Sequence, residues 1–454
     1  MPPEAALRPP GPPPRKKGVL GRVKYGVNFL LDPIGFVAGR FTQYGDVYYV
    51  PAETGPGLYV LRHPDHIRDV LIKEAAKFEK KHSGLNALRE VHGDGLLTSD
   101  GEVWRRQRRL VQPAFTRQRL ADYSGVMVEE AEEEAAFYAD GQGVDVSTRM
   151  MELTLRVVSR TLLGYSAGSN EAEDVRDAMK SMQDGLVGLG QFGPKWLSPA
   201  VRKRKKSTAL LDSIIYRLIA ERRESGPPDG PVDLLQMLLD ARDDEGDGRG
   251  LSDQEIRDQL VTLYIAGHET TANALTWTLY LLSQNPEAEA RLHEELESVL
   301  GGRPPTFADV ERLVYADKVV TESMRIYPPV PVISRKAMSD AKVGEWDVPA
   351  GSEVVIWIYQ THHDPRWYPE PWAFRPERWD EGAAKDRPKH AYLPYAAGAR
   401  ACIGKVFAQM EAVLVLCTLA QKVRFDHEPG HPVELHPRVT LNPKHGMRMI
   451  ARRR

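Results

Sequence analysis

The cysteine best placed to do chemistry lies in a short glycine-containing stretch near the C-terminus. The stretch reads Tyr395-Ala-Ala-Gly398-Ala-Arg400-Ala-Cys402-Ile-Gly404. A strong helical pattern starts at Cys402, and the unpaired amides and positive dipole of a helix start favour a thiolate. The two glycines permit backbone conformations closed to other residues and let a flat ligand approach. Arg400 adds a cation that suits a carboxylate.

A lone thiolate in a large protein has few chemical roles. A nucleophile needs a base, and no Cys–His pairing is suggested near Cys402. A zinc site needs several Cys or His ligands, and the only other cysteine, Cys417, is flanked by leucines in a helical segment and is expected to be a buried hydrophobe. An axial haem ligand needs one thiolate, room for the macrocycle and cations for its propionates. The stretch around Cys402 offers all three.

A second group of reactive side chains lies in the middle of the longest helical pattern. It reads Ala266-Gly267-His268-Glu269-Thr270. Small residues followed by an acid and a hydroxyl, halfway along a helix expected to be buried, favour close approach of a flat ligand and handling of protons. A threonine here is expected to open the backbone ladder and admit water. The alternative is that its hydroxyl bonds back to the preceding turn.

Composition excludes several function classes. The chain has 454 residues, and Lys+Arg 61 against Asp+Glu 63 gives a net charge of -2, so no field of one sign points to nucleic acid. Two cysteines exclude a secreted disulfide scaffold and fit a reducing compartment. No apolar run is long enough to predict a membrane anchor.

The first 18 residues differ from the rest. Five of residues 9–14 are proline, which allows extended chain but no helix core. We therefore expect residues 1–18 to be a poorly ordered leader and residues 19–454 to form one large domain located in the cytoplasm.

The remaining patterns predict a mainly α-helical fold with small β-sheets. Residues 43–62 predict a β-hairpin around a Gly/Pro turn, and residues 104–300 are mainly helical in pattern. A capping box at Ser252 and a proline after Asn285 bound a helix of roughly 50 Å. A final helix is expected at about 402–421, followed by short strands.

The cysteine stretch resembles the signature Phe-x-x-Gly-x-Arg-x-Cys-x-Gly of the cytochrome P-450 superfamily, with Tyr395 in place of the usual Phe. Further motifs follow the family's order: Trp104 and Arg108, the 266–271 segment, Glu322-Ser-Met-Arg325, and the Pro-rich 371–379 segment containing Arg378. The resemblance implies the P-450 fold and a buried network of Glu322, Arg325 and Arg378 that holds the cysteine loop.

The resemblance also implies the residues of a haem site. Cys402 would be the iron ligand of haem b, and Thr270 and Glu269 would be the catalytic alcohol and proton-relay acid. The residues expected around the cofactor are Arg400, Trp104, Arg108, Arg335, Tyr395, Gly398, Ala266 and Gly267. Arg105, Arg106 and Arg109 are expected to be a solvated basic face or a docking surface for an acidic electron donor. His268 is expected to make no iron bond.

The implied activity is monooxygenation. One oxygen atom of dioxygen would enter a small lipophilic substrate by hydroxylation or epoxidation, with electrons from NAD(P)H through a separate donor, expected to be a ferredoxin and its reductase. We expect a monomer without nucleic-acid partners. Two alternatives remain: a haem-thiolate peroxygenase or isomerase, and a haem sensor without turnover. Selectivity is expected to come from residues 77–99, 186–196 and 330–333.

Overall fold

The computed structural model describes residues 7–13, 29, 31–52, 55–81, 83–164, 199–227, 232–243, 245–246 and 248–454. Contacts group these residues into two compact units. The first unit comprises Met1–Ser83, Met324–Cys402 and Val439–Leu441, and the second comprises Gly84–Ser323, Ile403–Arg438 and Asn442–Arg454. The expected selectivity segment 186–196 lies outside the described residues.

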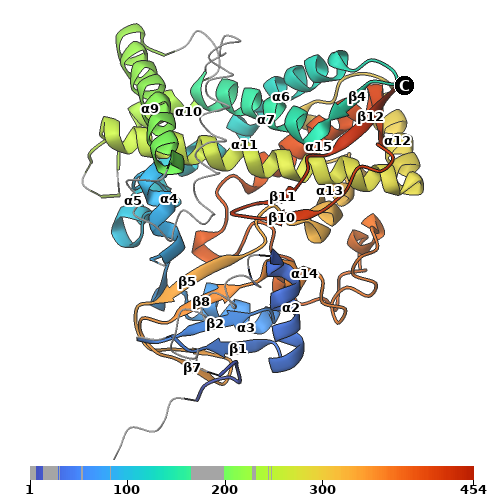
Figure 1. Ribbon diagram of the computed structural model, residues 1–454. Coiled ribbons are helices and arrows are strands. Elements are labelled where there is room, and N and C mark those ends of the chain that lie inside the picture. Colours follow the sequence, from blue (N-terminus) through green and yellow to red (C-terminus); the bar gives the residue numbers. More distant parts are fainter. Residues whose placement is uncertain are drawn as a thin grey trace, which may run out of the picture. The chain divides into compact units, whose positions relative to one another are not determined.

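The first unit is built on a five-stranded sheet, in the order β1-β2-β8-β5-β3 (Figure 1). Its strands are β1 (Val47–Val50), β2 (Leu58–Leu61), β3 (Phe78–Glu79), β5 (Ile333–Ala337) and β8 (Glu353–Ile356). β1 and β2 pair antiparallel, with Val47 opposite Leu61, which confirms the hairpin predicted at residues 43–62. β2 and β8 pair in parallel and join the two chain segments that make up the sheet.

Short helices cover this sheet, and a second small ribbon extends it. The helical elements are α2 (Pro33–Tyr44), α3 (Pro64–Arg68), η1 (Asp69–Lys73), η2 (Ala75–Lys77), α14 (Ile358–His362), η7 (Pro376–Trp379), η8 (Lys389–Ala391) and η9 (Gly398–Arg400). The ribbon pairs β6 (Ala341–Val343) with β7 (Trp346–Val348). The apolar core includes Leu61, Ile67 and Ile356, whose side chains are buried from solvent. β8 ends at Ile356, and α14 begins at Ile358.

The second unit is mainly helical (Figure 1). Its helices are α4 (Ser83–His92, whose first residue belongs to the first unit), α5 (Gly101–Val111), η3 (Gln112–Phe115), α6 (Arg117–Phe137), α7 (Val146–Leu163), α9 (Pro199–Ser225), α10 (Leu234–Asp240), α11 (Asp253–Gln284), α12 (Pro286–Leu300), η6 (Phe307–Asp309), α13 (Val314–Ile326, which ends in the first unit) and α15 (Lys405–Lys422). Its sheet has the order β4-β12-β9, with β4 (Gly143–Asp145), β9 (Val423–His427) and β12 (Arg448–Arg453). β10 (Leu435–Pro437) pairs with β11 (Leu441–Pro443). The predicted mainly α fold with small sheets is confirmed.

α11 is the long helix that the sequence predicted. Ser252 caps it: its hydroxyl accepts from the Glu255 amide, and the Glu255 carboxylate accepts from the Ser252 amide, while Asn285 ends it before Pro286. Its 32 residues span about 48 Å. α7 packs along it, and Figure 1 shows the two helices side by side.

Gly267 makes that packing possible. A Cβ at this position would lie 3.1 Å from Cγ2 of Val158 on α7, closer than ordinary van der Waals contact. The sequence predicted that Gly267 leaves room for a flat ligand. The missing side chain faces α7, and the room for a flat ligand stays a prediction.

Part of the predicted leader has defined contacts. The carbonyl of Pro10 accepts from the Tyr49 amide at 2.9 Å, and the Leu7 amide donates to the Asp347 carboxylate at 2.9 Å. The guanidinium of Arg8 lies 5.0 Å from the centre of the Tyr49 ring. Residues 7–13 therefore lie against β1, in contrast to the poorly ordered leader expected from the prolines.

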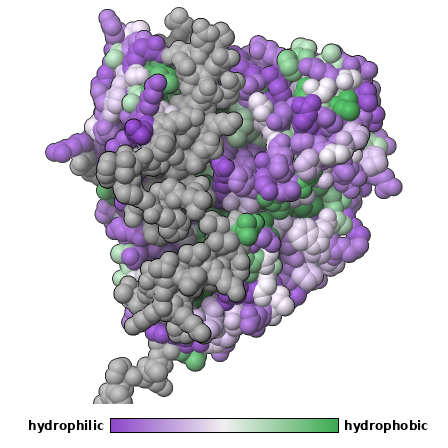
Figure 2. Space-filling view, in the orientation of Figure 1, coloured by the Kyte–Doolittle hydropathy of each residue, from purple (hydrophilic) through white to green (hydrophobic). Residues whose placement is uncertain are grey.

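Among the described residues, no helix is both long and apolar enough to cross a membrane. Figure 2 shows mostly hydrophilic residues on the coloured part of one face, with hydrophobic residues in small groups between them.

Candidate functional site

A tight loop presents Cys402. The Cys402 amide donates to the Tyr395 carbonyl at 2.9 Å, and the Ala401 amide donates to the Gly398 carbonyl at 3.0 Å. Two residues of the loop have positive φ, Ala396 at 55° and Gly398 at 74°. The thiol of Cys402 is exposed, whereas Cys417 is buried and burial raises the pKa of its thiol well above the usual range. Of the two cysteines, only Cys402 is available as a ligand.

Gly398 is required by its neighbours as well as by its φ angle. A Cβ there would lie 2.1 Å from the backbone carbonyl oxygen of Leu71, in η1. Backbone cannot move aside as a flexible side chain can, so only glycine lets the cysteine loop pack on η1. The sequence predicted conformational freedom here, and the structure adds this close approach.

The Tyr395 hydroxyl has a defined partner. It donates to the sulfur of Met324 at 3.7 Å, a reasonable distance for a sulfur acceptor. Met324 belongs to the Glu322-Ser-Met-Arg325 segment, so the tyrosine that replaces the usual phenylalanine is held by that motif. The hydroxyl is thereby directed to Met324.

Arg325 anchors the same region. Its side chain is fully buried, and its guanidinium donates to the carbonyls of His362 (3.0 Å), Pro371 (2.7 Å) and Ala373 (3.3 Å). It also lies 4.9 Å from the centre of the Tyr368 ring. This one side chain therefore joins α13 to two other backbone segments, one at His362 and one at residues 371–373. Arg378 donates to the Glu370 carbonyl at 2.7 Å, and the network with Glu322 stays a prediction.

The predicted propionate partners lie in both units. In the first unit, Arg335 on β5 is buried and Arg400 is half-buried in η9. In the second, Trp104 and Arg108 are half-buried on α5, four residues apart and thus on one helix face. Their contact with a haem stays a prediction.

The other arginines of α5 pair with acids of the second unit. Arg106 donates to the Glu255 carboxylate and to the Gly250 carbonyl, both at 2.7 Å. Arg109 pairs with the buried Asp243 at 3.1 Å, and Arg105 pairs with Glu102. The charges of Arg106 and Arg109 are matched by acids of their own unit, and the expected docking surface stays a prediction.

The middle of α11 breaks the helix's pattern of burial. Most of the helix is buried, yet Ala266 is exposed and Ile265, Gly267 and Thr270 are half-buried. The Thr270 hydroxyl donates to the Ala266 carbonyl at 2.8 Å. Since α11 is regular throughout, the expected opening of the backbone ladder is not present. The hydroxyl bonds back to the preceding turn instead.

Neighbouring side chains of α11 have different partners because each residue turns about 100° around the axis. The His268 ring bonds to the Tyr264 carbonyl at 3.1 Å, and burial lowers the pKa of this histidine. Glu269, which is 7% exposed, accepts from the Asn442 amide at 3.3 Å. These contacts involve neighbours within the second unit.

Two further residues lie near the middle of α11 and have no signal in the sequence. Thr154 of α7 donates to the His268 carbonyl at 3.0 Å. Glu411 of α15 is completely buried, and burial raises the pKa of its carboxyl well above the usual range, while the Thr271 hydroxyl lowers it. Only the helical position of each residue could be read from the sequence.

These features fit a haem. In the first unit, the exposed Cys402 lies on a loop held by backbone hydrogen bonds, as a thiolate ligand of haem requires. The arginines on β5 and η9 of the same unit can neutralise carboxylates.

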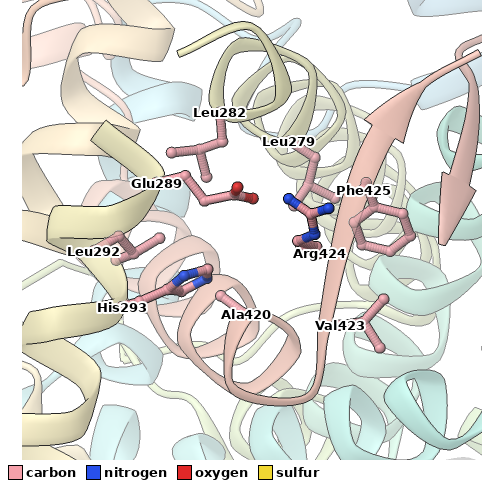
Figure 3. A pocket seen from close by; sticks show the side chains of 9 residues that line it. All are labelled: Leu279, Leu282, Glu289, Leu292, His293, Ala420, Val423, Arg424 and Phe425. Carbon is pink, nitrogen blue, oxygen red and sulfur yellow. The ribbon is translucent and has the colours of Figure 1, made fainter. Parts of the chain in front are cut away.

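A small cavity at the end of α11 is not the site. It lies between α11, α12, α15 and β9, where Glu289 and Arg424 point toward each other across it (Figure 3). Its volume open to a water-sized sphere is about 10 Å³, room for roughly one water. Its nearest α11 residue, Leu279, is about 14 Å along the helix from Thr270. It contains none of the predicted site residues.

We expect Gly398→Ala to lose haem, because the new Cβ meets the Leu71 carbonyl and the positive φ becomes strained by about 1 kcal/mol or more. Haem content per chain and the free energy of unfolding measure the effect. Ala396→Gly is the matched control, two residues away, and should keep its haem because it relieves a positive φ. Full haem content in Gly398→Ala would contradict the packing described.

Comparisons with known proteins agree with this geometry. The family model described as Cytochrome P450 matches residues 35–448. Cyclooctatin synthase of Streptomyces melanosporofaciens is 37% identical, covering 90% of this chain and 89% of the relative. Cyclooctat-9-en-7-ol 5-monooxygenase of the same species is 36% identical, covering 88% and 86%. Pentalenene oxygenase of Streptomyces avermitilis is 35% identical, covering 93% and 94%. A crystal structure described as the cytochrome P450DA heme domain matches with a TM-score of 0.86 at 28% identity, covering 99% of this chain and 98% of that one.

Proposed function

This chain belongs to the cytochrome P450 family and is a haem-thiolate monooxygenase, and we propose that its substrate is a polycyclic terpenoid. The reaction consumes the substrate RH, dioxygen, two electrons and two protons, and yields ROH and water. The observation that carries the residue assignments is the exposed thiol of Cys402 on a constrained loop.

The cofactor of the family is haem b, bound through a cysteine thiolate. Here Cys402 would be the ligand, and the group would supply the activation of dioxygen. Arg400, Arg335, Arg108 and the Trp104 indole would bind its propionates. Tyr395 and Gly398 would shape the loop that carries the thiolate, and Ala266 and Gly267 of α11 would be further neighbours of the cofactor.

Thr270 and Glu269 would manage the protons. The Thr270 hydroxyl now donates to the Ala266 carbonyl, and a change of its χ1 rotamer would let it donate to the dioxygen substrate instead. A proton passed on by Thr270 must be replaced at its Oγ1, and the neighbouring Glu269 carboxyl is the acid that would supply it. Slow proton supply would let reduced oxygen leave as hydrogen peroxide.

The substrate class rests on the relatives. Two of them carry names that describe oxygenation of cyclooctat-9-en-7-ol and of pentalenene. A rigid polycyclic hydrocarbon or alcohol is also what a mostly apolar pocket binds with little loss of conformational entropy. Residues 77–99 and 330–333 would contact it.

Other parts of the proposal concern the whole protein. A separate ferredoxin and reductase would deliver electrons from NAD(P)H. We propose a cytoplasmic monomer in which residues 19–454 form one domain. A peroxygenase or isomerase would need no electron donor, so dependence of turnover on NAD(P)H and a redox pair separates it from the monooxygenase.

Thr270→Ala should bind haem and substrate normally but form product at about one tenth of the parent yield per NAD(P)H or less, because proton delivery is impaired. The measurement is product and hydrogen peroxide per NAD(P)H with a surrogate redox pair. Thr278→Ala is the matched control, since Thr278 makes the same type of bond to the Ala274 carbonyl at 2.7 Å. Unchanged coupling in Thr270→Ala would remove Thr270 from the mechanism.

Polycyclic terpene hydrocarbons and alcohols should shift the haem spin state at concentrations about tenfold lower than fatty acids of equal carbon number, because they lose less conformational freedom on binding. Optical titration of the haem-loaded protein gives both dissociation constants. Tighter binding of the fatty acids would contradict the proposed substrate class while leaving the monooxygenase activity untouched.

A further inference from the structure

The loop between α4 and α5 lies with bare backbone against the first half of α11. A Cβ on Gly93 would lie 2.1 Å from Oδ1 of Asp258. A Cβ on Gly95 would lie 2.3 Å from Oγ1 of Thr262 and 2.5 Å from the Asp258 carbonyl oxygen. All of these residues belong to the second compact unit. The two glycines therefore let the loop approach the helix more closely than a residue with a side chain would.

Two consecutive side chains of α11 hold this loop by its amides. Oδ2 of Asp258 accepts from the Asp94 amide, and Oε1 of Gln259 accepts from the Leu96 amide, both at 2.9 Å. A backbone amide only donates, so Gln259 must present its oxygen to Leu96 and not its NH₂ group. Both acceptor side chains are buried, so water competes little for the two amides.

The Asp258 carboxylate is itself held in place. The Arg257 guanidinium and the Gln254 side-chain amide both donate to its Oδ1, at 2.9 and 2.8 Å. On α5, the Gln107 side-chain amide donates to the Asp94 carbonyl at 2.7 Å. The loop is thus bound through its amides by one helix and through a carbonyl by another. Its conformation is fixed without any ligand.

The fixed loop is part of a segment that would contact substrate. Residues 93–96 lie within the proposed contact segment 77–99. A binding surface that is already ordered favours a rigid ligand, because neither partner then loses much conformational freedom on binding. A flexible chain gains less from such a surface, since the chain itself must still be ordered.

We propose that Asp258 and Gln259 are positioning residues for substrate selectivity: by fixing the 93–96 loop, they give the site its preference for rigid polycyclic molecules over flexible chains. The inference rests on the proposed function, because it assigns the two residues a task only if the loop contacts the substrate. In this scheme both side chains act through the loop and touch neither substrate nor haem.

Gln259→Met tests the role of the acceptor, since it keeps a long side chain but leaves the Leu96 amide without its partner. The probes are the tricyclic alcohol cedrol and pentadecanoic acid, which have the same carbon number. In optical titrations of the haem spin state, the dissociation constant should rise about tenfold for cedrol and at most about threefold for the acid. Haem content and the affinity for imidazole, a small ligand of the iron, should stay at the parent values.

Gly95→Ala tests the close approach independently and decides the question if Gln259→Met does not fold. Its new Cβ would push the loop away from α11 and should lower the preference for cedrol by a similar factor. Gly125→Ala, on α6, is the matched control, because a Cβ there has nothing within 4 Å. Neither glycine has a positive φ, so the two substitutions differ in the space they meet.

The possible results separate this inference from the proposed function. A parent-like preference for cedrol in the haem-loaded variants would overturn the positioning role and leave the proposed function intact. An equal loss of affinity for both probes would also overturn it, because selectivity would then be unchanged. A parent that binds pentadecanoic acid at least as tightly as cedrol would overturn the proposed substrate class and this inference with it.

Discussion

The hydrogen bond from the Cys402 amide to the Tyr395 carbonyl closes the loop that presents Cys402, the proposed ligand of the haem iron. The loop needs positive φ angles at Ala396 and Gly398, and it needs the backbone of η1 within contact distance. Such a conformation persists only when its surroundings enforce it. Several hydrogen bonds stabilise the surroundings of the loop. The Tyr395 hydroxyl donates to the Met324 sulfur, and the Arg325 guanidinium donates to three backbone carbonyls.

The second constraint is the path of α11. A long buried helix holds its residues in fixed positions. In α11, consecutive side chains make hydrogen bonds to different neighbours. Glu269 is held by β11, while the Thr270 hydroxyl stays on its own helix. Acid and alcohol are thus adjacent in sequence but separately restrained.

Features set by local sequence were predictable. The capping box at Ser252 and the proline after Asn285 gave the ends of α11 to within one residue, and the hairpin and the final helix follow from equally local signals. The P-450 fold and the monooxygenase activity followed from the order of short motifs, and the comparisons confirm both.

Features set by packing were not predictable. The sequence showed that Gly267 is small, but not that its open side faces Val158. It showed a row of arginines on α5, but not the acids that neutralise Arg106 and Arg109, because those acids lie more than a hundred residues away. The Asn442 contact with Glu269 has no sequence signal, because it depends on how β11 meets the helix.

The central claim is that the thiolate of Cys402 binds the haem iron. Iron X-ray absorption of the haem-loaded protein tests it directly, with Cys417→Ala as the variant in which Cys402 is the sole cysteine. The account predicts a thiolate sulfur in the first coordination shell of both the parent and Cys417→Ala, and its absence in whatever haem-loaded protein Cys402→Ser yields. Loss of the sulfur in Cys417→Ala, or a parent iron with only nitrogen and oxygen neighbours, would contradict it.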